Sequence, residues 1–421
     1  MNALKKMIGN IEITKDLLML LIIGGLYALS IALSNTFVNV FLWKQSGKFI
    51  DIAIYNLSIV IFQPITFIIA GRLAKRIDRV IVLRLGVISL AVFYLTVLLL
   101  GVHAEQFLIL LGALLGIGMG FYWLAFNVLT FEITEPDTRD FFNGFLGLLT
   151  SFAGMVGPFL AGWIITRMDK LVGYKTIFAI SLTLFFAAVI MSFMLNRRSA
   201  EGVYSFVRII KERKRNANWK GILYAHYFQG LREGTFLFVI VVWVFITTNS
   251  ELALGTFGLI NSAVSFLAYY VATRFIKSEH RKKAILFGGI ILYAALSLIL
   301  FELTFAKLIT YGVIISIAYP ILLVPYVSLT YDVIGRSWKA REMRIEYIVV
   351  RELYLNYGRI TSICLFIIAI TIFDEKTSIP YLLPIVGIGH SLIYFCVRKI
   401  KFENKDENNE LILSNENGSN V

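Results

Sequence analysis

The chain has few charged residues, few cysteines and few histidines, and each shortage excludes a class of protein. Only 16% of its 421 residues are charged while 58% are hydrophobic, a balance too apolar for a soluble domain. The two cysteines, Cys364 and Cys396, form neither a disulfide framework nor a metal-binding pattern. With four histidines and no HExxH motif, Ser-His-Asp arrangement or phosphate-binding loop, we expect neither an enzyme nor a cofactor.

The apolar residues are gathered into twelve long runs. Each run has about 20 residues or more, enough to cross a hydrocarbon core of about 30 Å as a helix. The alternating pattern of lipid-facing strands is not seen. We therefore predict an all-α membrane protein whose twelve transmembrane helices lie near 17–42, 50–70, 80–101, 106–130, 141–166, 174–195, 221–247, 253–276, 284–305, 308–330, 346–373 and 380–398.

The distribution of Lys and Arg predicts the orientation in the membrane. If both termini are cytoplasmic, the cytoplasmic segments hold 31 of the 40 basic residues and the external loops hold 7. Basic residues favour the cytoplasmic side, so this asymmetry supports that topology. The net charge of +13 is then explained by a membrane face next to anionic headgroups, without nucleic acid as a partner. The two remaining cations, Arg232 and Arg359, lie inside predicted helices.

Three short patterns recur at nearly equal distances. LTFEI at 129–133 returns as LTYDV at 329–333, LYA at 26–28 returns at 223–225, and RLAKRIDR at 72–79 shares R-x-x-K-x-x-x-R with RFIKSEHR at 274–281. Their shifts of 200, 197 and 202 residues predict an internal repeat. We therefore predict two pseudo-symmetric six-helix bundles at 1–196 and 221–399, a basic cytoplasmic linker at 197–220 and a disordered cytoplasmic tail at 400–421.

The stretch GRLAKRIDR, 71–79, is similar to the pattern G-x-L-A-D-R-x-G-R that follows the second helix in the major facilitator superfamily. The resemblance covers the whole membrane region and implies that family's fold, with Gly71 allowing close backbone approach. It also implies that Arg72, Arg76 and Arg79 meet helix ends and acidic groups. The chain departs from the pattern at Lys75, where the family has aspartate, and at Asp78, where it has glycine.

A second likeness lies in the fifth predicted helix. The exporter motif G-x8-G-x3-G-P-x2-G-G is matched with two alanines in place of glycines, by Gly144, Ala153, Gly157, Pro158, Ala161 and Gly162. Small residues let helices pack closely, and proline bends a helix. The resemblance implies export, although Gly and Pro are also common in membrane helices generally. The overall likeness is to uncharacterised facilitator-type proteins of low-GC Gram-positive bacteria, which implies the bacterial cell membrane as the location.

The seventh predicted helix carries charges inside its apolar run, in HYFQGLREGTFLF at 226–238. Arg232 stands eleven residues beyond Gly221, roughly 17 Å deep. A charge there costs about 2.5 to 3.5 kcal/mol unless it meets water or a partner. Helical spacing places His226, Gln229 and Glu233 on one stripe and turns Arg232 away from it, so adjacent Arg232 and Glu233 do not pair.

The resemblance implies that the seventh and eleventh helices are neighbours around a central cavity, so Arg359 is the natural partner of Glu233. We expect polar and aromatic walls on the other side of the cavity from Asn35, Asn39, Tyr122, Trp123 and Asn127. Our hypothesis is that Glu233 exchanges a proton while Arg232 and Arg359 hold an anionic or polar substrate. The alternative is a static ion-pair network that sets helix packing, in which His226 only bonds a neighbour.

A gate is expected at the cytoplasmic ends of the helices. Glu132 and Asp332 occupy equivalent positions in the two repeats and are predicted to pair with Arg72, Arg76 or Arg274, with Glu132 supplying the carboxylate missing at Lys75. The alternative is that these carboxylates are simply solvated.

These observations favour a secondary active transporter with alternating access, coupled to protons and exporting a small amphipathic or anionic solute. One alternative is a flippase for lipid-linked or cell-envelope precursors, and another is a membrane sensor or scaffold that does not transport. The expected partners are a small-molecule substrate, protons and the lipid bilayer. The oligomeric state stays open, since one chain with twelve helices can form a pathway alone.

Overall fold

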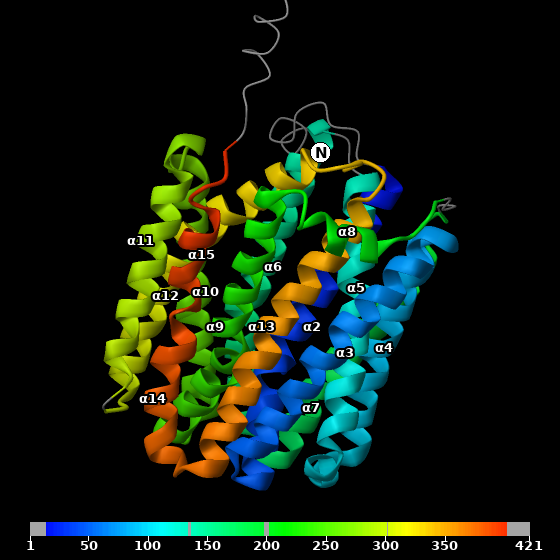
Figure 1. Ribbon diagram of the computed structural model, residues 1–421. Coiled ribbons are helices and arrows are strands. Elements are labelled where there is room, and N and C mark those ends of the chain that lie inside the picture. Colours follow the sequence, from blue (N-terminus) through cyan, green and yellow to red (C-terminus); the bar gives the residue numbers. More distant parts are fainter. Residues whose placement is uncertain (1–13, 134–135, 198–201, 301, 402–421) are drawn as a thin grey trace, which may run out of the picture.

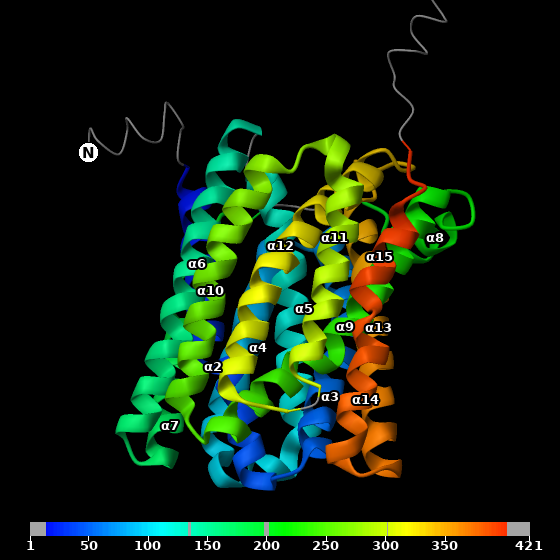
Figure 2. The same ribbon diagram turned by 90° about the vertical axis from the view of Figure 1, so that its left-hand side faces the viewer.

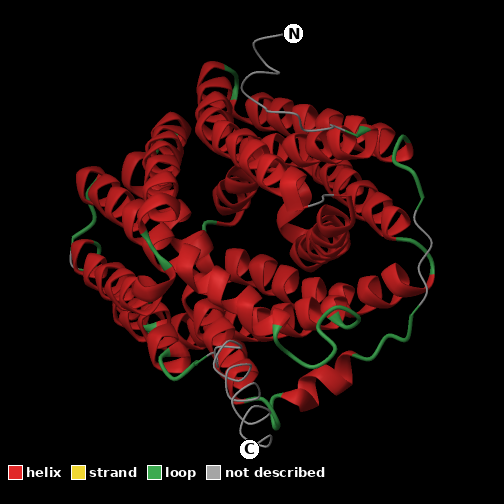
Figure 3. Ribbon diagram, turned by 90° about the horizontal axis from the view of Figure 1, so that it is seen from above, coloured by secondary structure: helices red, strands yellow, loops and turns green. Residues whose placement is uncertain are grey.

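The computed structural model describes residues 14–133, 136–197, 202–300 and 302–401, which are helices and loops without a strand (Figure 3). The first half contains α2 (Lys15–Ser46), α3 (Phe49–Arg76), α4 (Arg79–Leu100), η1 (Gly101–Phe107), α5 (Leu108–Ile133), α6 (Pro136–Arg167) and α7 (Lys170–Phe193). After the short α8 (Phe206–Glu212), the second half contains α9 (Ala217–Thr248), α10 (Glu251–Phe275), η2 (Ser278–His280), α11 (Arg281–Ala294), η3 (Ala295–Leu298), α12 (Phe305–Gly335), α13 (Arg344–Ile372), α14 (Glu375–Gly387) and α15 (Gly389–Val397).

The predicted apolar runs are helical, which confirms the all-α class. Ten stretches of the described chain are long and apolar enough to cross a membrane, with residues 79–130 counted as one and the 14-residue α11 left out. One predicted boundary is wrong: the ninth run was expected to reach 305, but α11 ends at Ala294 and the η3 turn that follows it ends at Leu298. Phe305 instead begins α12, because Thr304 caps that helix by accepting from Lys307 N at 3.3 Å. The predicted tail lies outside the described residues from 402 onward.

Polar side chains fix where several helices begin and end. Asn216 starts α9 by accepting from Trp219 N at 3.0 Å, and Asn249 ends it in the left-handed region at φ 48°. Asp78 starts α4 by accepting from Val80 N at 2.6 Å. Such caps satisfy the free backbone N–H groups at a helix start. The aspartate that departs from the family pattern is therefore a helix cap.

The packing of the first half is repeated in the second. In the first half, α3 and α4 pack on α5, α2 packs on α6 and α7, and α4 packs on α7. In the second half, α10 and α11 pack on α12, α9 packs on α13 and α15, and α11 packs on α15. These are the neighbours that a shift of about 200 residues predicts, since equivalent helices in the two repeats make equivalent contacts.

The two halves meet along α3 with α13, α6 with α10, and α2 with α9. Two small residues predicted on α6 lie at close helix contacts. A Cβ on Gly157 would meet Ala32 of α2, in the same half, at 2.7 Å, and Gly162 lies against the Glu251 carbonyl of α10, in the other half. The helical Pro158 packs on Gly255 of α10. The small-residue stripe thus lets α6 approach both halves closely.

The beginning of α2, the short α8 and the end of α15 lie at one end of the helices (Figures 1 and 2). We call this the linker end, and the opposite end the far end.

Candidate functional site

A cavity of about 500 Å³ lies among the helices of the second half. The three charges predicted inside the membrane, Arg232, Glu233 and Arg359, line it together. The rest of its wall is apolar and aromatic with a few polar groups: Phe236, Leu237, Ile240, Val241, Phe257, Asn261, Ser265, Leu292, Tyr311, Ile315, Ser316 and Tyr319. A concave apolar wall with a small polar set is typical of a small-molecule site.

Glu233 is held as a carboxylate acceptor at one side of the cavity. Arg359 donates to its Oε2 from Nη2 at 2.6 Å and from Nε at 3.2 Å. Gln229 Nε2 and the Tyr319 hydroxyl donate to its Oε1 at 2.8 and 3.1 Å. Four hydrogen bonds thus converge on this carboxylate, and the predicted pairing of Glu233 with Arg359 is present.

Glycines make this pairing possible by letting α9 and α13 approach backbone to backbone. A Cβ on Gly234 would lie 2.6 Å from the Arg359 carbonyl oxygen, and one on Gly358 would overlap the Tyr227 carbonyl. The axes are therefore close enough for a short carboxylate on one helix to reach a guanidinium on the other.

Arg232 is in a different situation. Its side chain is buried, with 7% of the residue exposed, and within the described chain no carboxylate forms an ion pair with it. Nη2 donates to the Tyr311 hydroxyl at 3.3 Å, and the guanidinium lies 4.6 Å from the Phe236 ring centroid. Nε has no hydrogen-bond partner among the residues that the structure describes. A buried cation that keeps an unused donor beside a cavity is a candidate anion site.

The other predicted residues of the seventh helix lie outside the cavity wall. His226 Nδ1 lies 2.6 Å from the Tyr326 hydroxyl and 2.9 Å from the Ile222 carbonyl, which is the neighbour-bonding arrangement that the sequence left open. Gln229 touches the site only through its hydrogen bond to Glu233.

The residues predicted for the opposite wall do not line this cavity either. Asn39 donates weakly to the Asn35 carbonyl at 3.5 Å and accepts from Asn56 at 2.8 Å. Tyr122 is buried with its ring stacked on Tyr27 at 3.9 Å, and Trp123 meets the same ring edge-on. Asn127 is half-buried on α5. The first half contributes an aromatic cluster and an asparagine pair of its own.

The two acidic residues of the repeats are ion-paired, but with other arginines than predicted. Glu132 pairs with Arg79 at 2.9 Å, and Asp332 pairs with Arg281 at 2.6 Å. Arg79 and Arg281 are the last residues of the two R-x-x-K-x-x-x-R patterns, so the same bridge occurs in both halves. The predicted partners Arg72, Arg76 and Arg274 are exposed instead. Each bridge joins helices of one half, so neither is a gate between the halves.

A buried ion pair does connect the halves at the linker end. Lys75 of α3 lies 2.6 Å from Glu346 of α13, with side chains 9% and 0% exposed. Lys75 also donates to the carbonyls of Val203 and Glu342, and Ser205 N donates to Glu346. Gly71 leaves room beside this pair for Tyr204. Burial and the Glu346 charge raise the pKa of Tyr204, which keeps its hydroxyl protonated.

A second ion pair connects the halves at the far end. Lys44 of α2 lies 2.5 Å from Glu251 at the start of α10. The Tyr174 hydroxyl donates to the same carboxylate at 3.3 Å. In the described part of the chain, a lysine–glutamate pair thus joins the two halves at each end of the helices.

Sequence reasoning missed both of these pairs and one buried histidine. His390, at the break between α14 and α15, is fully buried with no hydrogen-bond partner for either ring nitrogen among the described residues. Its ring packs 5.5 Å from that of Tyr319, the donor to Glu233. The sequence carries no spacing signal for these contacts, because each joins helices far apart along the chain.

Comparison with known proteins agrees with this architecture. The family model for the Major Facilitator Superfamily matches residues 17–343. A Bacillus subtilis (strain 168) protein with the name "Uncharacterized protein YqgE" is 64% identical over 410 residues, which cover 97% of this chain and 95% of the relative. A Geobacillus stearothermophilus protein, "Uncharacterized protein in sodM 3'region", is 64% identical over 174 residues, or 41% of this chain and 81% of the relative.

Proposed function

This chain belongs to the major facilitator superfamily of transporters, and from that premise we propose that it is a proton-coupled secondary transporter that exports a small amphipathic or anionic solute. Its twelve helical segments form two six-helix bundles that rock around the cavity, with the linker end on the cytoplasmic side. The repeated packing of the two halves and the 31 basic residues assigned to that side support this arrangement.

The proposal rests on polar atoms in the cavity wall that lack hydrogen-bond partners among the described residues. Arg232 keeps Nε unused, and Asn261 Oδ1 is buried without a partner among the described residues. Buried polar groups are normally hydrogen-bonded. A ligand could therefore accept from Arg232 through an anionic oxygen and donate to Asn261 through an N–H or O–H group. The apolar wall would then take the body of the same molecule.

Glu233 is the group proposed to exchange the proton. While ionised, it engages Arg359 through two hydrogen bonds. Protonation would remove the charge that holds Arg359 and would leave a second guanidinium beside Arg232 for the solute. Proton and anion would therefore influence each other through Arg359, which is the linkage that a coupled transporter needs.

The ion pairs at the two ends support alternating access. Lys75–Glu346 joins the halves at the linker end and Lys44–Glu251 joins them at the far end. Opening one end of the pathway requires one of these pairs to separate while the other holds. Each pair is then a two-state element whose equilibrium the solute and proton can bias.

Proteoliposomes that contain the purified protein and a pH-sensitive dye test the proposal. We expect proton movement when an amphipathic anion is added, and a much smaller response to a neutral analogue of the same shape, because only the anion engages Arg232. Lipid-linked envelope precursors belong in the same panel, and competition between the two solute types decides which is preferred. If no anion in the panel causes proton movement, although the protein in the vesicles is folded, the proposal is wrong.

A further inference from the structure

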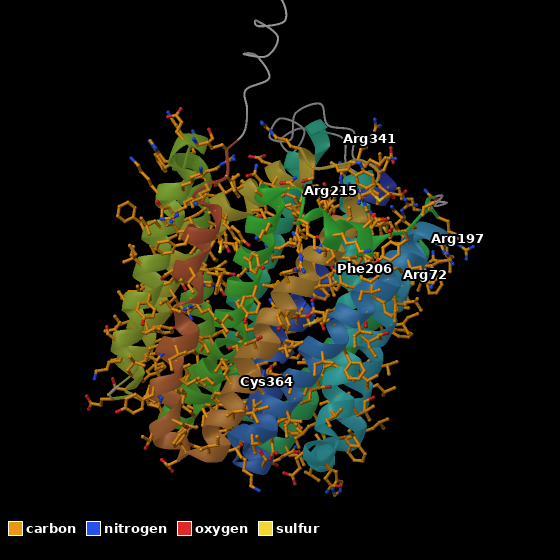
Figure 4. The ribbon with its side chains drawn as sticks, viewed as in Figure 1. Arg72, Arg197, Phe206, Arg215, Arg341 and Cys364 are labelled. Carbon is orange, nitrogen blue, oxygen red and sulfur yellow. The ribbon has the colours of Figure 1, made fainter. Side chains whose placement is uncertain are left out.

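His390 is a buried histidine to which the proposed transport cycle gives no role. It lies at the start of α15, which continues the line of α14 along one side of the bundle (Figures 1 and 4). The residue is fully buried, and neither ring nitrogen has a hydrogen-bond partner among the described residues. A neutral imidazole has one donor and one acceptor nitrogen, and buried polar groups are normally hydrogen-bonded. His390 therefore offers an unused acceptor to its neighbours.

The residues on either side of His390 fix its position. A Cβ on Gly389 would lie 3.2 Å from the Arg232 backbone N of α9. Ser391 donates to the Gly289 carbonyl of α11 at 2.8 Å. These contacts place His390 beside the part of α9 that lines the cavity.

Tyr319 connects His390 with the cavity. The centroids of the two rings lie 5.5 Å apart, and Tyr319 also belongs to the cavity wall. Its hydroxyl donates to Glu233 Oε1 at 3.1 Å. One side chain thus packs on the unpartnered histidine and bonds the carboxylate that is proposed to take up the proton.

The place of a proton on Glu233 decides what Tyr319 must do. Oε2 already accepts twice from Arg359, so the proton is better accommodated on Oε1. The groups next to Oε1 are the Gln229 amide nitrogen and the Tyr319 hydroxyl. An amide nitrogen cannot accept a hydrogen bond, whereas a hydroxyl oxygen can. Tyr319 must then accept from Glu233 and turn its own hydrogen to a different acceptor.

The groups around Tyr319 narrow the choice of that acceptor. Three further ionisable groups act on Tyr319 or on His390: Arg232 from α9, Arg359 from α13 and Tyr269 from α10. Arginine has donors only, which leaves the Tyr269 hydroxyl and the His390 ring. Because His390 is fully buried and has no partner within the described chain, it gains more from the hydrogen bond.

We propose that His390 is a positioning residue for the proton exchange of Glu233, and this inference rests on the function proposed above. When Glu233 takes up a proton, the Tyr319 hydroxyl accepts from it and donates to a ring nitrogen of His390, which a rotation of either ring brings within reach. When the proton leaves, the hydroxyl donates to Glu233 again. The exchanged proton is carried by Glu233, and His390 supplies the acceptor that completes the protonated arrangement.

An infrared titration of the purified full-length protein in lipid tests this exchange without any solute. The C=O band of a protonated carboxyl group that is missing from Glu233→Gln reports the protonation of Glu233. His390→Phe leaves the turned hydroxyl without an acceptor, which disfavours the protonated form about tenfold, so the midpoint of this band falls by about one pH unit. His390→Gln keeps an acceptor and retains most of the wild-type midpoint.

Double variants separate positioning from packing. In a Tyr319→Phe background, His390→Phe causes no further shift, since His390 acts only through the Tyr319 hydroxyl. Tyr269→Phe is the matched control, because it removes the hydroxyl of another tyrosine that acts on Glu233. In that background, His390→Phe still lowers the midpoint.

The outcomes distinguish this inference from the transport proposal. If Glu233 takes up a proton but His390→Phe leaves the midpoint unchanged, or shifts it equally in the Tyr319→Phe background, the inference alone is wrong. If Glu233 takes up no proton at any pH at which the protein stays folded, both are wrong. The unfolding midpoint checks that each variant is folded, and His390→Leu replaces His390→Phe if the latter is not.

Discussion

Glu233→Gln abolishes solute-driven proton movement in proteoliposomes while leaving the protein folded. The amide keeps the shape of the side chain and an oxygen that can accept from Arg359, but it cannot gain or lose a proton at neutral pH. The dye response to an active solute therefore falls to that of vesicles without protein. The unfolding midpoint, measured on the same preparation, reports whether the loss is functional rather than structural.

Glu352→Gln is the matched control for this variant. Glu352, on α13, likewise pairs with an arginine, Arg351, at 2.7 Å, and the two side chains are 12% and 13% exposed. The Glu233 and Arg359 side chains are 12% and 18% exposed. Only the latter pair lines the cavity. We expect Glu352→Gln to retain solute-driven proton flux; equal loss in both variants would favour a static packing role for these ion pairs.

Reversal of one charge in the buried Lys75–Glu346 pair should lower the free energy of unfolding more than reversal of a charge in an exposed ion pair. Removing one partner of a buried pair typically costs about 3 to 5 kcal/mol, because the other charge stays buried without compensation. Lys75→Glu goes further by placing two carboxylates together in a site where Glu346 is fully buried. The unfolding midpoint of this single variant should fall sharply, as should that of Glu346→Lys.

The double variant Lys75→Glu/Glu346→Lys should recover a large part of this loss, since opposite charges again face each other across the interface. Recovery stays incomplete because Lys75 also donates to the Val203 and Glu342 carbonyls. Lys339→Glu provides the control: its pair with Glu342 is exposed, and exposed pairs contribute about 1 kcal/mol or less. A double variant no more stable than the singles would show that the pair does not join the halves.

The helices and the pairing of Glu233 with Arg359 could be predicted from the sequence. Long apolar runs give the length and depth of each membrane helix. Glu233 and Arg359 lie at similar depths in their predicted membrane helices, and the family resemblance implied that these two helices are neighbours. The repeat spacing was equally informative, since the equivalent bridges Arg79–Glu132 and Arg281–Asp332 use residues of the matched patterns.

Rotation of a helix about its axis could not be predicted, and the errors follow from that. Depth places Asn39 and Tyr122 near the cavity but does not tell which way they face, and they pack inside the first half instead. The same ambiguity led to Arg274 rather than Arg281 as the partner of Asp332. Nothing in the sequence singled out Glu346, which is fully buried, because its partner Lys75 comes from the other half of the chain.

Thiol accessibility of the cavity tests alternating access most directly. A cysteine replaces Leu237, an exposed residue of its wall, after the half-buried Cys364 and Cys396 are changed to serine. A membrane-impermeant reagent is then applied to right-side-out and inside-out vesicles.

Glu346→Gln should raise labelling from the linker side, and Glu251→Gln should raise labelling from the far side, because each variant frees one end while the other pair still holds. Labelling that changes on the same side in both variants, or on neither, would contradict an account in which the two ion pairs alternate.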